Sequence, residues 1–215
     1  MHKVIRGTIP NSLKLNSKKW TEELLEQVNL NQSFSQIPSQ YVNKYKQDDV
    51  KEALKKMYKG LCCYCESSVG VQTYEHIEHL KPKSIFNDKC FEWKNLHLSC
   101  QVCNVSYKKD NWDYEYPILD PSKDDISLFL EINLDTGEIC PINNNNRAKT
   151  TINHVGLNRK DLVGKRLRII NRLKRILSSV IEMDDSSYNE FCNEIKLLSE
   201  DLGYKLLFDT FISRL

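Results

Sequence analysis

Apolar residues recur at helical spacing in several parts of the chain. Positions three and four apart are apolar in six stretches, which predicts helices over residues 20–30, 48–59, 148–154, 158–180, 187–202 and 205–214. Thr21 and Asn158 are the expected N-caps of the first and fourth helices. Gly60 and Gly156 are expected to end the second and third, because glycine favours the left-handed conformation that follows a helix. The polar residues 31–46 are expected to form a long connection.

Shorter stretches have the composition of strands. Residues 71–80 favour a strand and run into Lys81-Pro82-Lys83, where the proline must leave regular pairing. Residues 128–132 and 138–142 flank Asp135-Thr136-Gly137, which predicts a β-hairpin. Helices combined with so few strands predict an α+β fold, in which a small module is embedded in a mostly helical frame.

Composition and charge narrow the classes of protein. The chain has 215 residues, of which 40% are hydrophobic and 28% charged, and this predicts a folded protein with a core of its own. No apolar run reaches the roughly 18 residues of a membrane span, and the first ten residues lack the apolar block of a signal peptide. We therefore expect a cytoplasmic protein without a membrane partner. The 31 basic and 29 acidic side chains give a net charge of +2, so a nucleic-acid partner must be argued from local patches.

Five of the eight cysteines lie in two short groups. Each group contains a C-x-x-C pair, Cys62 with Cys65 and Cys100 with Cys103. This spacing lets a turn direct two thiolates at one tetrahedral metal, whereas disulfides need an oxidising compartment. We therefore expect these four residues to hold a structural Zn²⁺ ion, although Cys63 could compete with Cys62 as a ligand. The isolated cysteines are expected to be small buried residues: Cys90, Cys140 and Cys192.

Further motifs surround the cysteine pairs in a fixed order. Glu78-His79-Leu80-Lys81-Pro82 lies between the pairs, Asn95-Leu96 stands shortly before Cys100, and Asn104 directly follows Cys103. This order of acid-His-aliphatic-x-Pro, Asn-Leu and C-x-x-C-Asn resembles the HNH endonuclease family. Four segments also resemble the HNH nucleases of retrons and of the Septu anti-phage system (PtuB-like proteins), namely residues 60–66, 78–83, 93–96 and 150–159.

The resemblance implies a ββα-metal (HNH) finger with a four-cysteine zinc site. It divides the chain into three expected parts, which are an N-terminal helical segment, a zinc-stabilised HNH nuclease module, and a β-hairpin with a C-terminal helical region: residues 1–60, 61–120 and 121–215.

The residue types between and beside the cysteines suit phosphodiester hydrolysis. This reaction needs a base for water and a cation at the scissile phosphate. His79 suits the role of base, because imidazole titrates near neutrality. The carboxylate of Glu78 and the amide oxygen of Asn104 would form a hard site that favours Mg²⁺ or Mn²⁺. The family implies that Asn95 holds the loop and the base in place.

A second acid-His pair precedes the first by three residues. Glu75-His76 offers His76 as an alternative base, but only His79 has the proline that the motif expects, at Pro82. We therefore expect His76 to be structural or to contact phosphate, and His97 to take part in packing.

Several basic residues are candidates for contact with nucleic acid. Lys81 and Lys83 follow the acid-His motif, and Lys108 and Lys109 follow the second cysteine pair. The predicted helix over residues 158–180 carries a cationic ridge, because four basic residues fall on one side at helical spacing: Lys165, Arg168, Arg172 and Arg175. The alternative is a solvated face that pairs with acidic residues of the next helix. If the ridge binds nucleic acid, its contacts are sequence-independent.

The sequence thus predicts a metal-dependent HNH endonuclease that cuts phosphodiester bonds in phage or plasmid DNA. The resemblance further implies an anti-phage role with a partner ATPase, and the chain has no Walker-type phosphate loop of its own. Two alternatives are a non-catalytic zinc module that binds nucleic acid or a partner, and a nuclease directed at RNA such as tRNA.

Overall fold

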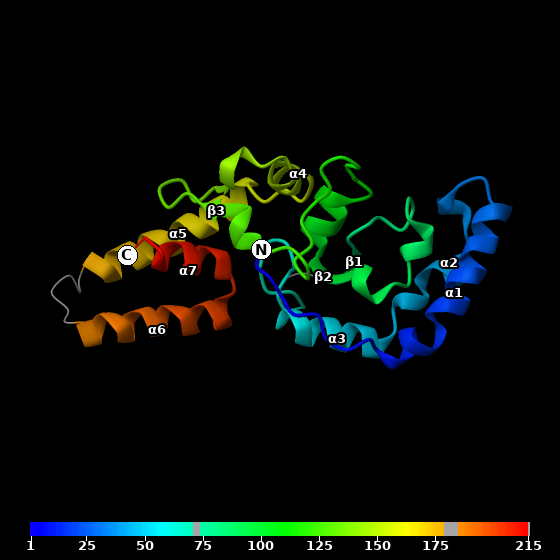
Figure 1. Ribbon diagram of the computed structural model, residues 1–215, viewed down its shortest axis with the longest axis horizontal. Coiled ribbons are helices and arrows are strands. Elements are labelled where there is room, and N and C mark those ends of the chain that lie inside the picture. The colour runs from blue at the N-terminus through cyan, green and yellow to red at the C-terminus, as the bar shows by residue number, and fades with distance from the viewer. Residues whose placement is uncertain (71–73, 179–184, 215) are drawn as a thin grey trace.

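A computed structural model describes residues 1–70, 74–178 and 185–214 (Figure 1). Within these residues, helices surround two small antiparallel sheets of two strands each, which confirms the predicted α+β class. The first two helices lie at one end of the molecule and the last three at the other, and the third helix lies in the middle beside the hairpin of the first two strands (Figure 1). None of the helices among the described residues combines the length and the hydrophobicity that a membrane span requires.

The N-terminal helices differ from the prediction at their start. Helix α1 (Asn11–Leu30) begins well before residue 20, so Thr21 lies inside it and donates its hydroxyl to the carbonyl of Ser17 at 2.8 Å. The prediction of Thr21 as an N-cap was wrong, because residues 11–19 are mostly polar and give little periodic signal. The connection after α1 contains the short helix α2 (Ser39–Val42). Helix α3 (Asp48–Tyr58) ends two residues before Gly60, and Gly60 has the left-handed conformation expected after a helix, with φ +71°.

The central hairpin pairs β1 (Glu75–His79) with β2 (Leu96–Cys100) in antiparallel register. Every residue of β2 is buried, and α3 packs against this strand. A short helical segment with π-helix hydrogen bonds, Val102–Lys108, follows β2 directly. Two strands followed by a short helix therefore carry the acid-His motif and the residues beyond the second cysteine pair.

The C-terminal part begins with the predicted hairpin, in which β3 (Leu130–Ile132) pairs with β4 (Ile139–Pro141). The helices α4 to α7 follow: Asn146–His154, Lys160–Ser178, Asp185–Leu202 and Lys205–Ile212. The prediction that Asn158 is the N-cap of this helix was wrong, because α5 begins two residues later, at Lys160. The side chain of Asn158 accepts from the backbone N–H of Ile139 and donates to the carbonyl of the same residue, both at 2.8 Å. Asn158 therefore joins the start of α5 to β4. The expected end of α5 near Val180 lies outside the described residues.

The residues before α1 cross the middle of the molecule. Arg6 donates to the carbonyls of Trp93 at 2.7 Å and Leu96 at 2.9 Å, and Trp93 donates its indole N–H to Gly7 at 3.0 Å. The backbone N–H of Val4 donates to the carbonyl of Pro121 at 2.8 Å. These bonds fix the loop that leads into β2. One cluster of buried apolar side chains runs through all three expected parts of the chain.

Candidate active site and metal centre

The sulfurs of Cys62, Cys65, Cys100 and Cys103 form one buried cluster in which all ligand atoms lie within 4.8 Å of one another. None of the four forms a disulfide. When four sulfurs surround a zinc ion tetrahedrally at about 2.3 Å, any two of these sulfurs lie about 3.8 Å apart. The sulfurs of Cys65 and Cys100 lie 3.8 Å apart. The cluster could therefore hold a metal ion, and its all-sulfur composition and geometry suit zinc.

Two hydrogen-bond donors are directed at these sulfurs. The backbone N–H of Cys103 lies 3.4 Å from the sulfur of Cys100, and Nη1 of Arg159 lies 3.3 Å from the sulfur of Cys103. Burial by itself lowers the pKa of Arg159, but the neighbouring Cys103 and Cys65 raise it further than burial lowers it. The guanidinium therefore stays charged and offsets part of the negative charge that four thiolates carry.

The remaining cysteines lie outside this cluster. Cys63 is buried, and its backbone N–H donates to the carbonyl of Leu98 at 2.8 Å, which ties the first cysteine turn to β2. Cys90 and Cys192 are buried, as predicted, whereas Cys140 on β4 is partly exposed.

A small cavity of about 40 Å³ brings together the three residues that the HNH motif singles out, Glu78, His79 and Asn104. Lys83 and Lys108 line the same cavity. Asp110, which is exposed, also lines the cavity and was not predicted from the sequence. These side chains come from the end of β1, the loop after it and the helical segment that follows β2.

The imidazole of His79 is held in a defined orientation. Its Nε2–H donates to the carbonyl of Cys90 at 2.9 Å, which leaves Nδ1 as the acceptor. The ring of Tyr45 meets the imidazole edge-on, with ring centroids 4.5 Å apart. Burial, with help from the charges of Lys83 and Lys108, lowers the pKa of His79 to about 3 against the opposing effect of the bond to Cys90. The side chain is therefore neutral at neutral pH, the state that a general base requires.

Asn95 fixes the loop after His79. Its Oδ1 accepts from the backbone N–H of Lys81 at 2.8 Å, and its Nδ2 donates to the carbonyls of Lys81 at 3.0 Å and Lys89 at 3.1 Å. Asn95 is 5% exposed and does not line the cavity. These contacts agree with a residue that positions the loop and does not touch the reacting atoms.

Glu78 is part of a buried ion pair. The ammonium of Lys108 lies 2.7 Å from Oε1 of Glu78 and donates to the carbonyl of His79 at 2.8 Å. The hydroxyl of Tyr64 donates to the same carboxylate oxygen at 3.2 Å. Lys108 is only 1% exposed, so it is a partner of Glu78 and not the exposed phosphate contact that the sequence suggested.

The other two histidines of this region lie elsewhere. His97 is completely buried, and its ring bonds to the hydroxyl of Tyr58 and to the guanidinium of Arg6 at 3.1 Å. This agrees with its predicted packing role. His76 is half-buried and lines a neighbouring groove, not the cavity of His79.

The predicted cationic ridge lies on the exposed side of α5. All four residues are exposed: Lys165, Arg168, Arg172 and Arg175. The alternative of pairing with α6 is not seen, because no ion pair joins the two helices among the described side chains. Lys81 is exposed beside the ring of Phe86, with its ammonium 5.3 Å from the ring centroid, and Lys83 is half-buried at the cavity.

Three named proteins are similar to this chain over more than half of its length. No family model matches the chain. It is 33% identical over 154 residues to the Septu protein PtuB of Bacillus mycoides (strain KBAB4), which covers 58% of this chain and 52% of that protein. It is 29% identical over 140 residues to the Septu protein PtuB of Bacillus thuringiensis, with coverages of 64% and 52%. The chain thus spans about half the length of these two relatives.

A third relative is matched over more of its length. The chain is 31% identical over 157 residues to a protein of Vibrio cholerae serotype O1 biovar El Tor named "Retron Vc95 putative HNH endonuclease", which covers 66% of this chain and 73% of that protein. The cysteine cluster and the hairpin beside it define a small α+β module that could hold a metal ion. The chain belongs to the family of Septu PtuB and retron-associated HNH proteins.

We predict that metal content distinguishes Cys63 from Cys65, two residues further along the chain. Elemental analysis of purified protein should find about one zinc per chain in the wild type and in Cys63→Ala, because one tetrahedral site takes four thiolates. Cys65→Ala should lose most of its zinc. Full zinc content in Cys65→Ala, or loss of zinc in a folded Cys63→Ala, would contradict the assigned ligand set.

Replacing Lys108 should cost far more stability than replacing its exposed neighbour. Lys108→Met leaves the carboxylate of Glu78 buried without its cation, which costs about 3–5 kcal/mol. Lys109→Met changes an exposed side chain and should stay within about 0.5 kcal/mol. Denaturant unfolding measures both, and equal effects would show that the ion pair contributes nothing specific.

The protonation of His79 gives a prediction with a definite sign. The pKa of about 3 in the folded protein lies below the ordinary value of 6.5, so the unfolded chain binds the proton first. Between these two pH values this group lowers the free energy of unfolding by up to about 1.4 kcal/mol per pH unit as the pH falls. In nitrogen NMR spectra, His79 should remain the neutral Nε2–H tautomer at pH 5. A titration midpoint near 6.5 would contradict the described environment.

Proposed function

We propose that this chain is a metal-dependent HNH endonuclease that hydrolyses phosphodiester bonds in DNA as part of anti-phage defence. The observation that carries the proposal is the shared cavity of Glu78, His79 and Asn104, in which His79 is neutral and held by a backbone carbonyl. Relatives named as an HNH endonuclease and as Septu proteins support both the reaction and the setting.

His79 acts as the general base in this proposal. Nε2–H stays bound to Cys90, so Nδ1 takes the proton from the attacking water. Asn95 holds the backbone of Lys81 and so keeps the loop after His79 in place. The ammonium group of Lys83 beside the cavity stabilises the negative charge that builds up on the phosphate, whereas Lys108 holds Glu78 in place.

The oxygen donors of the cavity suit a catalytic Mg²⁺ or Mn²⁺ ion. Glu78 and Asn104 would hold it, and Asp110 offers a third oxygen at the same cavity. When bound, the ion supplies Lewis-acid stabilisation of the phosphate and of the leaving oxygen. Because Oε1 of Glu78 also accepts from Lys108 and Tyr64, the carboxylate is aligned before any ion binds. The ion of the four-cysteine cluster is structural in this proposal and is Zn²⁺.

The DNA contacts and the partner follow from the same proposal. The exposed ridge on α5, formed by Lys165, Arg168, Arg172 and Arg175, binds the phosphate backbone, and Lys81 and Lys83 bind it near the cavity. A separate ATPase works with the nuclease in defence, and both act in the cytoplasm. The substrate and the partner are proposals because this chain spans about half the length of its PtuB relatives.

Replacing the base should abolish cleavage while the fold is kept. We expect His79→Ala to lower the rate of plasmid cleavage with added Mg²⁺ by about 10²–10⁴-fold, the usual contribution of a general base. His154→Ala is the matched control, because His154 lies at the end of α4, lines neither this cavity nor the groove beside it, and its Nδ1 has no hydrogen-bond partner to lose. Circular dichroism and zinc content verify that each variant is folded.

The other outcomes each favour a different assignment. Wild-type cleavage by His79→Ala together with no cleavage by His76→Ala at saturating substrate would transfer the role of base to His76. Binding of DNA by the wild type without any cleavage would favour the non-catalytic zinc module. Cleavage of RNA, including tRNA, but not of duplex or single-stranded DNA would favour the RNA-directed nuclease.

A further inference from the structure

A second hollow, with a volume of about 520 Å³, lies directly beside the candidate active site. It is lined by the turn before α3, by the start of α3 and by β1. Ile77, Lys83 and Asn104 line both this groove and the cavity of His79. The two hollows therefore adjoin each other, and a chain-like ligand bound in the groove lies next to the cavity of the candidate base.

The groove is basic. Lys46, Lys51 and Lys83 line it, and its one lining carboxylate belongs to Glu75, which already pairs with Lys55 at 3.1 Å. Lys51 pairs at 3.0 Å with Asp48, a residue that is 94% exposed at its side chain, so this pair is readily exchanged for another anion. For Lys46 and Lys83, no carboxylate partner is found among the described residues.

One aromatic ring connects these cations to the catalytic histidine. Tyr45 is 4% exposed, and the ammonium groups of Lys46 and Lys83 each lie 5.9 Å from its ring centroid. The same ring packs edge-on against His79. The positions of both lysines are therefore fixed relative to the base by a buried side chain. Asn43 and His76 add neutral hydrogen-bonding groups to the wall of the groove.

We propose that this groove, formed by Asn43, Lys46, Lys51, His76 and Lys83, binds the phosphodiester backbone of a nucleic-acid strand and leads it to the active site. The inference rests on the proposed nuclease function and adds the path of its substrate. Lysines and neutral polar groups bind phosphates without reading bases, so the contact is independent of sequence and sensitive to salt. In this arrangement His76 contacts the strand and is not the base.

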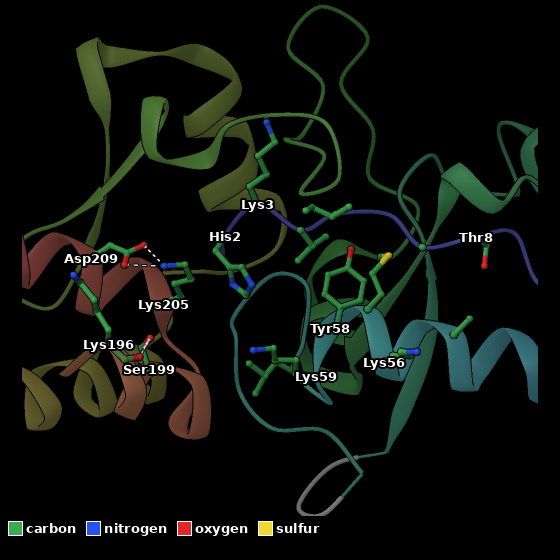
Figure 2. A pocket seen from close by; sticks show the side chains of 16 residues that line it. His2, Lys3, Thr8, Lys56, Tyr58, Lys59, Lys196, Ser199, Lys205 and Asp209 are labelled. Carbon is green, nitrogen blue, oxygen red and sulfur yellow. Dashed lines mark hydrogen bonds and ion pairs between the residues drawn. The ribbon is translucent and has the colours of Figure 1, made fainter. Parts of the chain in front are cut away.

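A second basic cleft provides a control surface. It has a volume of about 820 Å³ and lies between the N-terminal segment, α3 and the C-terminal helices (Figure 2). It shares no lining residue with the cavity of His79. Lys56 and Lys196 are exposed and line this cleft, and Lys56 lies on the same helix as Lys51. Charge reversal at Lys56 and Lys196 therefore matches charge reversal in the groove in size and differs from it only in place.

Strand binding without added divalent metal tests the groove apart from catalysis. Fluorescence anisotropy with a labelled 20-nucleotide single strand, as DNA and as RNA, compares Lys46→Glu/Lys51→Glu with Lys56→Glu/Lys196→Glu. We expect the groove variant to bind both strands on the order of tenfold more weakly, with a log–log salt dependence shallower by about 0.7–1 per lysine removed. The control variant should stay within about twofold of the wild type.

Each other outcome decides between the inference and the proposed function. If the groove variant binds with wild-type affinity, or if both variants lose affinity equally, the groove does not bind the strand as proposed. Groove-dependent binding by a protein that cleaves nothing with Mg²⁺ or Mn²⁺ would keep the groove and refute the nuclease. Cleavage with an unchanged KM in the groove variant would keep the nuclease and refute the groove. Matching unfolding curves for both double variants exclude a loss of folding as the cause.

Discussion

The rest of the site depends on the four cysteine sulfurs that converge between a turn, a strand and a helical segment. Cys62 and Cys65 belong to the turn after α3, Cys100 is the last residue of β2, and Cys103 lies in the first turn of the helical segment that carries Asn104. A hairpin of ten residues has little stability by itself. A structural zinc ion contributes about 10–16 kcal/mol to folding in small zinc-binding modules, which is enough to fix all three elements together.

Buried cations also join the elements that surround the cysteine cluster. Lys108 neutralises Glu78 and at the same time binds the carbonyl of His79, so one ammonium fixes the helical segment to both residues of the acid-His pair. Arg159 brings the start of α5 to the sulfur of Cys103. Gly156 allows a close approach nearby, because a Cβ there would lie 2.2 Å from the ring of Tyr107. The C-terminal helices are thus joined to the site by charge and by shape.

The sequence revealed those parts of the site that are encoded locally. The cysteine pairs, the acid-His motif and Asn104 are recognisable because each chemistry fixes a short spacing, and the structure brings them to one cluster and one cavity. The burial of Lys108 and the contacts of Tyr45 were not predicted, because both depend on segments distant in the chain. Asn158 was wrongly predicted to be an N-cap because its hydrogen-bond partner, Ile139 on β4, lies 19 residues away in the chain. The role of Asn95 was implied only by the family, and its three backbone contacts support that role.

In the proposed mechanism, the thiolate cluster keeps the oxygen donors and the imidazole together around one cation site. Paramagnetic broadening by Mn²⁺ in NMR spectra tests this most directly, with the zinc-loaded protein compared with protein stripped of zinc under reducing conditions. We expect Mn²⁺ to broaden the backbone signals of Glu78, His79 and Asn104 together in the zinc-loaded protein, and we expect this common site to be lost when zinc is removed. Broadening that spares these three residues, or that persists unchanged without zinc, would contradict the account.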